Sequence, residues 1–156
     1  MNILVLCTGN SARSILLESI LNHTGAGRVT AFSAGSKPTG KVHPQSLHLL
    51  GQKGHDTSHA RSKSWDEFSS PDAPKIDLVI TVCSNAAAEI CPIWHGSLIS
   101  THWGVDDPAT CTTDCKTAFE TAYNILAARA ARLLAEPFED MTATRLKSLV
   151  DQIGTR

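Results

Sequence analysis

One stretch near the start of the chain reads Cys7-Thr8-Gly9-Asn10-Ser11-Ala12-Arg13-Ser14. An apolar run at 3–6 precedes it, and an apolar pattern of helical period at 15–21 follows it. We therefore expect a strand, a tight loop and a helix. The backbone N–H groups of such a loop converge with those of the helix N-terminus and attract an anion. The stretch predicts an anion-binding loop at the end of the first strand.

Two side chains of this loop have the chemistry of a nucleophilic site. Arg13 can present a planar fork to a tetrahedral oxyanion. Cys7 stands at the mouth of the loop, where the helix dipole and Arg13 are expected to favour its thiolate form. A buried structural cysteine in an ordinary turn is the alternative, and the flanking strand and helix count against it. We predict that Cys7 attacks an anion held by the loop.

Composition limits the classes of function. A chain of 156 residues suits one domain, 1–156, and its hydrophobic fraction of 42% supports a sizeable core. The net charge is −1 and basic runs are absent, so we expect no nucleic-acid or membrane partner. Neither a signal segment nor a long apolar run is evident, which predicts a cytoplasmic protein. Five cysteines are an odd number for a disulfide framework.

Strand patterns alternate with helix patterns along the rest of the chain. This alternation predicts an α/β protein whose central parallel sheet of four strands is flanked by helices. In the second helix Leu47, Leu49 and Leu50 are expected to face inward, and in the long helix Ile125 is expected to do so. The expected strands lie at 2–6, 28–32, 77–82 and 97–103, and the expected helices run from the loop to 23, from about 44 to 51, and over 84–90, 116–134 and 142–153.

Chemistry-bearing residues follow three of the expected strands. Cys7, Cys83 and the Asp106-Asp107 pair can therefore converge at the carboxyl edge of the sheet. When a thiolate attacks an oxyanion, the departing oxygen needs a proton. We predict Asp107 as the general acid, with Asp106 as second choice. Turn initiation is the commoner role of Asp before Pro, and it remains the alternative.

The other cysteines form two pairs. A fully helical 84–90 would place the Cα atoms of Cys83 and Cys91 roughly 12 Å apart, from rises of about 1.5 Å. A disulfide needs less than about 7 Å, so we predict that oxidation would unwind this helix. Two buried thiols that pack as small apolar groups are the alternative. Cys111 and Cys115 are expected to be incidental, rather than a redox pair or a thiol site with His102.

The sequence predicts no metal site formed by histidines. The seven histidines form no metal motif, and His43, His48 and His55 are expected to be solvated. Because a zinc site shows denser Cys and His spacing, no structural metal is expected.

The loop resembles the phosphate loop of low-molecular-weight protein tyrosine phosphatases and, more closely, that of the arsenate reductases built on the same fold. Further matches span about 2–138 of the chain. They are Ser33-Ala34-Gly35, Val82-Cys83, Cys91-Pro92-Ile93 and His102-Trp103-Gly104-Val105-Asp106-Asp107-Pro108. The resemblance implies a low-molecular-weight phosphatase-like fold.

The resemblance also implies a cysteine relay that reduces arsenate, with phosphate or sulfate as mimics of the substrate. Cys7 attacks arsenate and Asp107 protonates the departing oxygen. Cys83 then attacks the sulfur of Cys7, and arsenite leaves. Cys91 attacks Cys83, and thioredoxin reduces the final disulfide. The implied substrate-binding residues are Thr8, Gly9, Asn10, Ser11, Ala12, Arg13 and Ser14.

This chain differs from the family pattern at some positions, and the roles of family residues at those positions are not assigned to it. Some relatives have a cysteine where Ala12 stands. Some relatives also bind potassium through residues that match Asn10, Glu18 and Ser33, and the segment 61–64 does not complete that site here. We therefore expect no metal and no organic cofactor.

Three alternatives stay open. One is a tyrosine phosphatase, although Ala109 and Thr110 stand where such enzymes carry aromatic residues after Asp-Pro. Another is a non-enzymatic sensor that binds an oxyanion or arsenite. The third is a reductase coupled to glutaredoxin or mycothiol, which Cys91 disfavours because a small thiol can replace the last protein cysteine.

Overall fold

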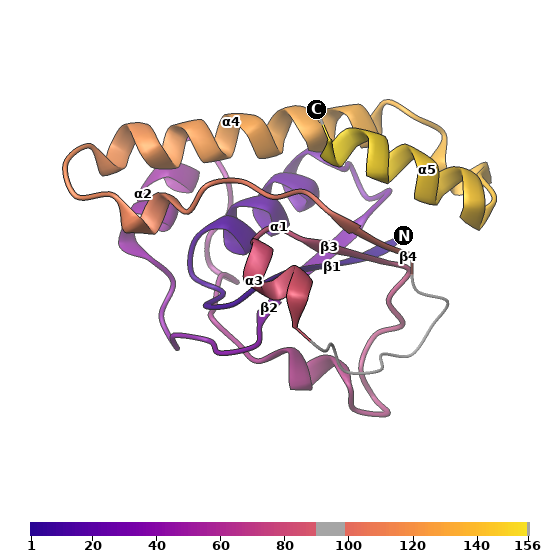
Figure 1. Cartoon of the computed structure of the whole chain (residues 1–156), viewed down its shortest axis with the longest axis horizontal. Coiled ribbons are helices and arrows are strands. Elements are labelled where there is room, and N and C mark those ends of the chain that lie inside the picture. Colours follow the sequence, from indigo (N-terminus) through magenta and orange to yellow (C-terminus); the bar gives the residue numbers. More distant parts are fainter. Residues whose placement is uncertain (90–98, 156) are drawn as a thin grey trace.

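The computed structural model describes residues 1–89 and 99–155. Within them, four strands form one parallel sheet in the order β2-β1-β3-β4 (Figure 1). The strands are β1 (Asn2–Cys7), β2 (Thr30–Gly35), β3 (Leu78–Thr81) and β4 (Ile99–His102). The predicted α/β class and four-stranded parallel sheet are confirmed.

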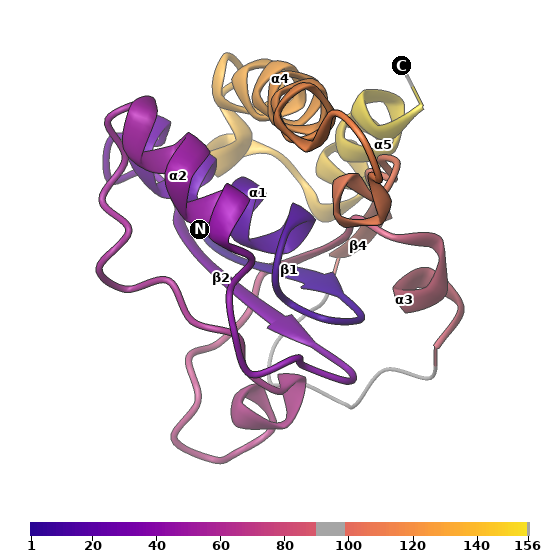
Figure 2. The same ribbon diagram turned by 90° about the vertical axis from the view of Figure 1, so that its left-hand side faces the viewer.

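Helices cover the two faces of the sheet unequally. The long helices gather on one face, and the other carries the short 3₁₀ helix η1 (Trp65–Phe68) with its loops (Figure 2). The α-helices are α1 (Arg13–Thr24), α2 (Pro44–Gln52), α3 (Ser84–Ala88), α4 (Cys115–Leu134) and α5 (Ala143–Gly154). Among residues 1–89 and 99–155, no helix combines the length and apolarity that crossing a membrane would need.

The apolar runs of β1 and β3 explain why the sheet forms the centre of the protein. Successive side chains of a strand point to opposite faces, so a strand covered on both faces must be apolar at every position. Ile3 and Val5 pack in the core beneath the helices, whereas Leu4 and Leu6 pack with Phe68 on the other face. The loop after β1 is thereby anchored to the most buried strand.

The second strand lies later in the sequence than predicted. It spans Thr30–Gly35 rather than 28–32, because residues 33–35 continue the ladder with β1. Its last residue, Gly35, pairs with Cys7. A Cβ atom on Gly35 would lie 2.4 Å from the carbonyl oxygen of Thr8, so only glycine lets β2 pass this close to the loop.

Three side chains are placed differently from the helical patterns. Leu47 and Ile125 are 37% and 39% exposed, so they lie outside the core that their spacing predicted. His55 is buried rather than solvated, since its ring hydrogen-bonds Ser19 and Tyr123 from two helices. Periodicity locates the apolar face of a helix but not its edges.

The segment after β3 forms a shorter helix than predicted. α3 ends at Ala88, and Glu89 is extended with φ −76° and ψ 149°. The separation of Cys83 and Cys91 worked out for a fully helical 84–90 therefore does not apply. Cys91 itself, and residues 97–98 of the predicted fourth strand, lie outside the described residues. The long fourth helix and the final helix are confirmed within one or two residues of their predicted bounds.

Candidate active site

The loop from β1 to α1 surrounds the thiol of Cys7 with hydrogen-bond donors. Cys7 is 4% exposed. The backbone N–H of Asn10 donates to its Sγ at 3.2 Å, and the Oγ of Ser14 lies 2.9 Å from the same sulfur. Asn10 adopts a left-handed φ of 46°, which aims that N–H inward. The loop thus has the converging donors of an anion site.

One cavity of about 280 Å³ brings the predicted chemistry together. Cys7 lies in its wall with the whole loop, and Cys83 and Asp107 enter from the ends of other strands. Asp106 is exposed and lines two other cavities, one of which Asp107 also borders, but it does not line this one. The residues lining the cavity are Cys7, Thr8, Gly9, Asn10, Ser11, Ala12, Arg13, Thr39, Cys83, Asn85, Asp107 and Ala109.

Arg13 and Asp107 form an ion pair at the edge of this cavity. A guanidinium nitrogen of Arg13 lies 2.9 Å from Oδ2 of Asp107, and another donates to the carbonyl oxygen of Val105 at 3.1 Å. The Oδ1 of Asp107 also accepts from the N–H of Ala109 at 3.0 Å, which starts the 3₁₀ helix η2 (Pro108–Thr110). Asp107 is therefore a turn initiator that also reaches the cavity.

The pKa of the Cys7 thiol differs from the sequence prediction, which expected the thiolate to be favoured. Burial raises its pKa, against the hydrogen bonds from Ser14 and Asn10, which lower it. Arg13 does not offset the burial in this state because its guanidinium is engaged by Asp107 and Val105. The lowered pKa expected for Cys7 is therefore not found in this arrangement.

Cys83 lies 3% exposed at the start of α3. Its Sγ accepts from the N–H of Ala86 at 3.4 Å and lies 3.6 Å from the Oγ1 of Thr8 in the loop. This places the second thiol against the loop that carries the first. The third cysteine of the predicted relay, Cys91, lies outside the described part of the chain.

A buried polar network behind the loop was missed by sequence reasoning. The amide nitrogen of Asn10 donates at 2.9 Å to Ser14 and at 2.9 Å to Ser33. Its amide oxygen accepts from the backbone N–H of Lys63 at 2.9 Å. Ser33 belonged to a quoted motif, but Lys63 lies between two serines in a polar stretch that carries no sequence signal.

The residues behind the loop do not fit the potassium ion that the resemblance raised. The ammonium of Lys63 lies 3.8 Å from Oε2 of Glu18, where a bound cation would need that carboxylate. Across 1–89 and 99–155, no group of three or more His, Cys, Asp or Glu side chains is placed to hold a metal ion.

Cys111 and Cys115 are joined by a disulfide, so the expectation of two incidental thiols is wrong. Their Cα atoms lie 5.2 Å apart because Cys111 precedes α4 and Cys115 begins it. The thiol site with His102 does not form either. The Nδ1 of His102 instead lies 2.8 Å from the hydroxyl of Thr81.

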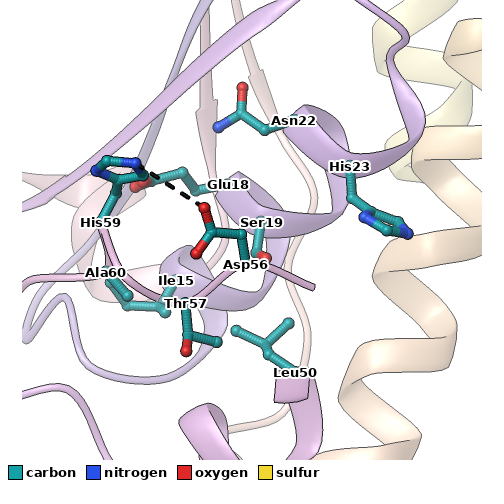
Figure 3. Close-up of a pocket in the computed structure, with 10 residues that line it drawn as sticks. All are labelled: Ile15, Glu18, Ser19, Asn22, His23, Leu50, Asp56, Thr57, His59 and Ala60. Atoms are coloured by element: carbon teal, nitrogen blue, oxygen red, sulfur yellow. Dashed lines mark ion pairs between the residues drawn. The ribbon is translucent and has the colours of Figure 1, made fainter. Parts of the chain in front are cut away.

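A larger cavity, of about 390 Å³, lies between the outer side of α1 and the segment 56–60 (Figure 3). Two residues of that segment, Asp56 and His59, form an ion pair at 3.9 Å (Figure 3). Neither a thiol nor an arginine lines it. The side chains that the sequence predicted to carry the chemistry, Cys7, Arg13 and Cys83, line the smaller cavity at the loop instead.

Comparison with known proteins agrees with this geometry. Arsenate reductase 1 of Staphylococcus epidermidis is 35% identical over 104 residues, which are 67% of this chain and 75% of that protein. The solved structure of an arsenate reductase from Archaeoglobus fulgidus is 25% identical with a TM-score of 0.69, over 86% of this chain and 99% of that one. A structure of an arsenate reductase in the phosphate binding state matches equally well, with 25% identity, a TM-score of 0.69 and 86% and 96% coverage.

The family profile described as low molecular weight phosphotyrosine protein phosphatase matches residues 2–145. This match includes the anion loop, Cys83 and Asp107. Because it extends over most of the 156 residues, the chain belongs to the low molecular weight phosphotyrosine protein phosphatase family.

Proposed function

We propose that this protein reduces arsenate to arsenite through a relay of cysteines. The observation that carries the proposal is the single cavity that holds Cys7, Cys83 and Asp107 against the anion loop. A phosphatase of this architecture needs the first and third of these residues but has no use for a second thiol. The relatives named arsenate reductase support the same substrate.

Binding of arsenate involves the loop amides and a change of partner by Arg13. A tetrahedral oxyanion seated above Cys7 meets the converging N–H groups of the loop and of the α1 N-terminus. Arg13, which lies at the cavity edge, exchanges its bond to Asp107 for two bonds to the oxyanion. This exchange leaves Asp107 free to take a proton and act as an acid.

The first chemical step forms a bond between the sulfur of Cys7 and arsenic. The thiolate attacks, an arsenic–oxygen bond breaks, and Asp107 gives its proton to the departing oxygen, which leaves as water. Ser14 and the N–H of Asn10 hold the sulfur as its charge develops. Bound oxyanion and attacking sulfur are thereby placed by the same loop.

The second step uses the thiol of Cys83. Its sulfur attacks the sulfur of Cys7, the sulfur–arsenic bond breaks, and the bonding pair stays on arsenic. Arsenic(V) becomes arsenic(III), and the two thiols become a Cys7–Cys83 disulfide. In sum, arsenic acid and two thiols give arsenous acid, one disulfide and one water.

The last steps regenerate the enzyme. We propose that the thiol of Cys91 attacks Cys83, which frees Cys7 and leaves a Cys83–Cys91 disulfide for thioredoxin to reduce. Cys83 is 3% exposed, so a reductant protein needs this transfer to reach the oxidised sulfur. If a small thiol attacked Cys83 directly in place of Cys91, the reductase would be coupled to glutaredoxin or mycothiol rather than to thioredoxin.

Mapping disulfides by mass spectrometry after one turnover without reductant tests the relay. The expected result is one arsenite per protein and a Cys83–Cys91 bond, with Cys7 returned to the thiol. In Cys91→Ser the bond should stop at Cys7–Cys83. Release of arsenite without either bond would refute the relay.

Measurements of turnover distinguish arsenate reduction from phosphatase activity and from anion sensing without catalysis. Among the cavity residues of the described chain there is no aromatic side chain, and Ala109 lies where a phosphotyrosine ring would need support. We expect arsenate-dependent NADPH consumption with thioredoxin and its reductase, together with weak hydrolysis of p-nitrophenyl phosphate. Stoichiometric binding without turnover would identify a sensor instead.

A further inference from the structure

Two opposite charges are buried together behind the loop, away from the reacting atoms. The side chains of Lys63 and Glu18 are 8% and 17% exposed, and their charged atoms lie 3.8 Å apart. Oε2 of Glu18 is buried without a hydrogen bond in the described part of the chain, so the ammonium is its compensation. A buried carboxylate that lacks a positive partner is strongly destabilising.

Other charges near this pair are already engaged. Arg61 also acts on Glu18, but its guanidinium is held by both carboxylate oxygens of Glu67, at 2.9 Å and 2.6 Å. Burial raises the pKa of Glu18 and lowers that of Lys63, and each charge opposes the shift of the other. Each of the two charges therefore favours the charged form of its partner.

The pair is linked to the thiol through three further residues. The hydroxyl and the backbone of Ser33 lower the pKa of Glu18, which burial raises. Ser33 accepts at 2.9 Å from the amide of Asn10, whose amide oxygen is held by the backbone of Lys63. Asn10 in turn donates to the sulfur of Cys7. Lys63 thus holds Asn10 directly through its backbone, and its ammonium lies beside the carboxylate of Glu18, whose pKa responds to Ser33.

We propose that Lys63 is a positioning residue that supplies a tethered cation, so that Glu18 and Ser33 hold Asn10 in the left-handed conformation that aims its N–H at Cys7. Because this ammonium lies beside the carboxylate of Glu18, the loop of this chain needs no free cation there. Without the positive charge, Glu18 either takes a proton or draws water inward. Ser33 and Asn10 then lose their fixed partners, and the thiolate of Cys7 loses a donor.

The test follows the reactivity of Cys7 in Lys63→Met, Lys63→Arg, Glu18→Gln and the double variant Lys63→Met/Glu18→Gln. Alkylation by iodoacetamide is measured against pH, and mass spectrometry quantifies the modified Cys7 peptide. In Lys63→Met we expect the midpoint of the pH profile for Cys7 alkylation to rise by about one pH unit. The rate of alkylation near neutral pH should then fall about tenfold. Lys63→Arg should retain most of the reactivity, because it keeps the charge.

Lys53→Met is the matched control, since Lys53 pairs with Glu120 at 3.6 Å near the surface, away from the loop. It should keep the midpoint of the parent chain. The double variant should lie nearer to the parent than Lys63→Met does, because neither buried charge is then left alone. If Lys63→Met fails to fold, a double variant that folds and reacts supports the proposal, and one that also fails overturns it.

A parent-like midpoint in folded Lys63→Met would overturn the proposal. Potassium chloride, compared with lithium chloride at equal ionic strength, adds an independent test. We expect potassium to restore reactivity in Lys63→Met and to leave the parent chain unchanged. An equal response of both proteins, or none in either, would show that no cation position exists. Alkylation reports on Cys7 whether or not arsenate is reduced, so failure here is distinct from failure of the proposed function.

Discussion

Replacement of Asp107 by Asn tests the exchange of partners by Arg13. In the structure Asp107 both holds Arg13 at 2.9 Å and lies in the cavity wall, so it competes with the oxyanion for the guanidinium. Asp107→Asn removes the competing charge and the acidic proton while nearly keeping the size of the side chain. We expect opposite effects on binding and on turnover.

The magnitude of the binding effect follows from the exposure of the pair. The side chains of Arg13 and Asp107 are 15% and 36% exposed. An ion pair so open to water contributes about 0.5–1 kcal/mol, so its removal should tighten phosphate binding about two- to fivefold. General acid catalysis contributes about 10²- to 10⁴-fold, so kcat for arsenate should fall by a factor in that range.

Calorimetric titration with inorganic phosphate and thioredoxin-coupled turnover measure the two effects on the same protein. Asp106→Asn is the matched control, because Asp106 carries the same charge as Asp107 but does not line the cavity. It should change neither quantity more than about twofold. Weaker phosphate binding in Asp107→Asn, or a kcat within tenfold of the parent, would show that Asp107 does not act as both competitor and acid.

Three further predictions concern the relay, a buried histidine and the loop support. Cys91→Ser should abolish steady-state turnover with thioredoxin while leaving the first release of arsenite, and full activity would contradict the relay. Burial and the neighbouring His23 lower the pKa of His55. As the pH falls below about 6.5, the unfolded chain therefore binds a proton before the folded protein does, and the free energy of unfolding should decrease. Urea unfolding should show a smaller decrease on acidification in His55→Gln than in His48→Gln, the control at an exposed position. Gly35→Ala should lower the free energy of unfolding by about 1–3 kcal/mol, whereas Gly51→Ala, with nothing within 4 Å, should not.

The elements that the sequence predicted well are those whose signal is local. The buried strands β1 and β3 are unbroken apolar runs, and α4 and α5 repeat apolar residues at helical period over three turns or more. The loop after β1 was recognisable because Gly9, Asn10 and Arg13 lie within a few residues of Cys7. Burial of a continuous segment and the turn that follows it are properties of neighbouring residues.

Contacts between distant segments were decided by the tertiary structure alone. The sequence predicted that Cys7, Cys83 and the Asp106-Asp107 pair could converge, but the parallel pairing of β1 with β3 and of β3 with β4 decides that Asp107, and not Asp106, lines the cavity with the two thiols. It contained no sign that Lys63 would face Glu18. The sequence gives the charge of each side chain, but the partner of a charge depends on which distant segments pack together. The pairing of Lys63 with Glu18 therefore forms only when the segment that carries Lys63 packs against α1.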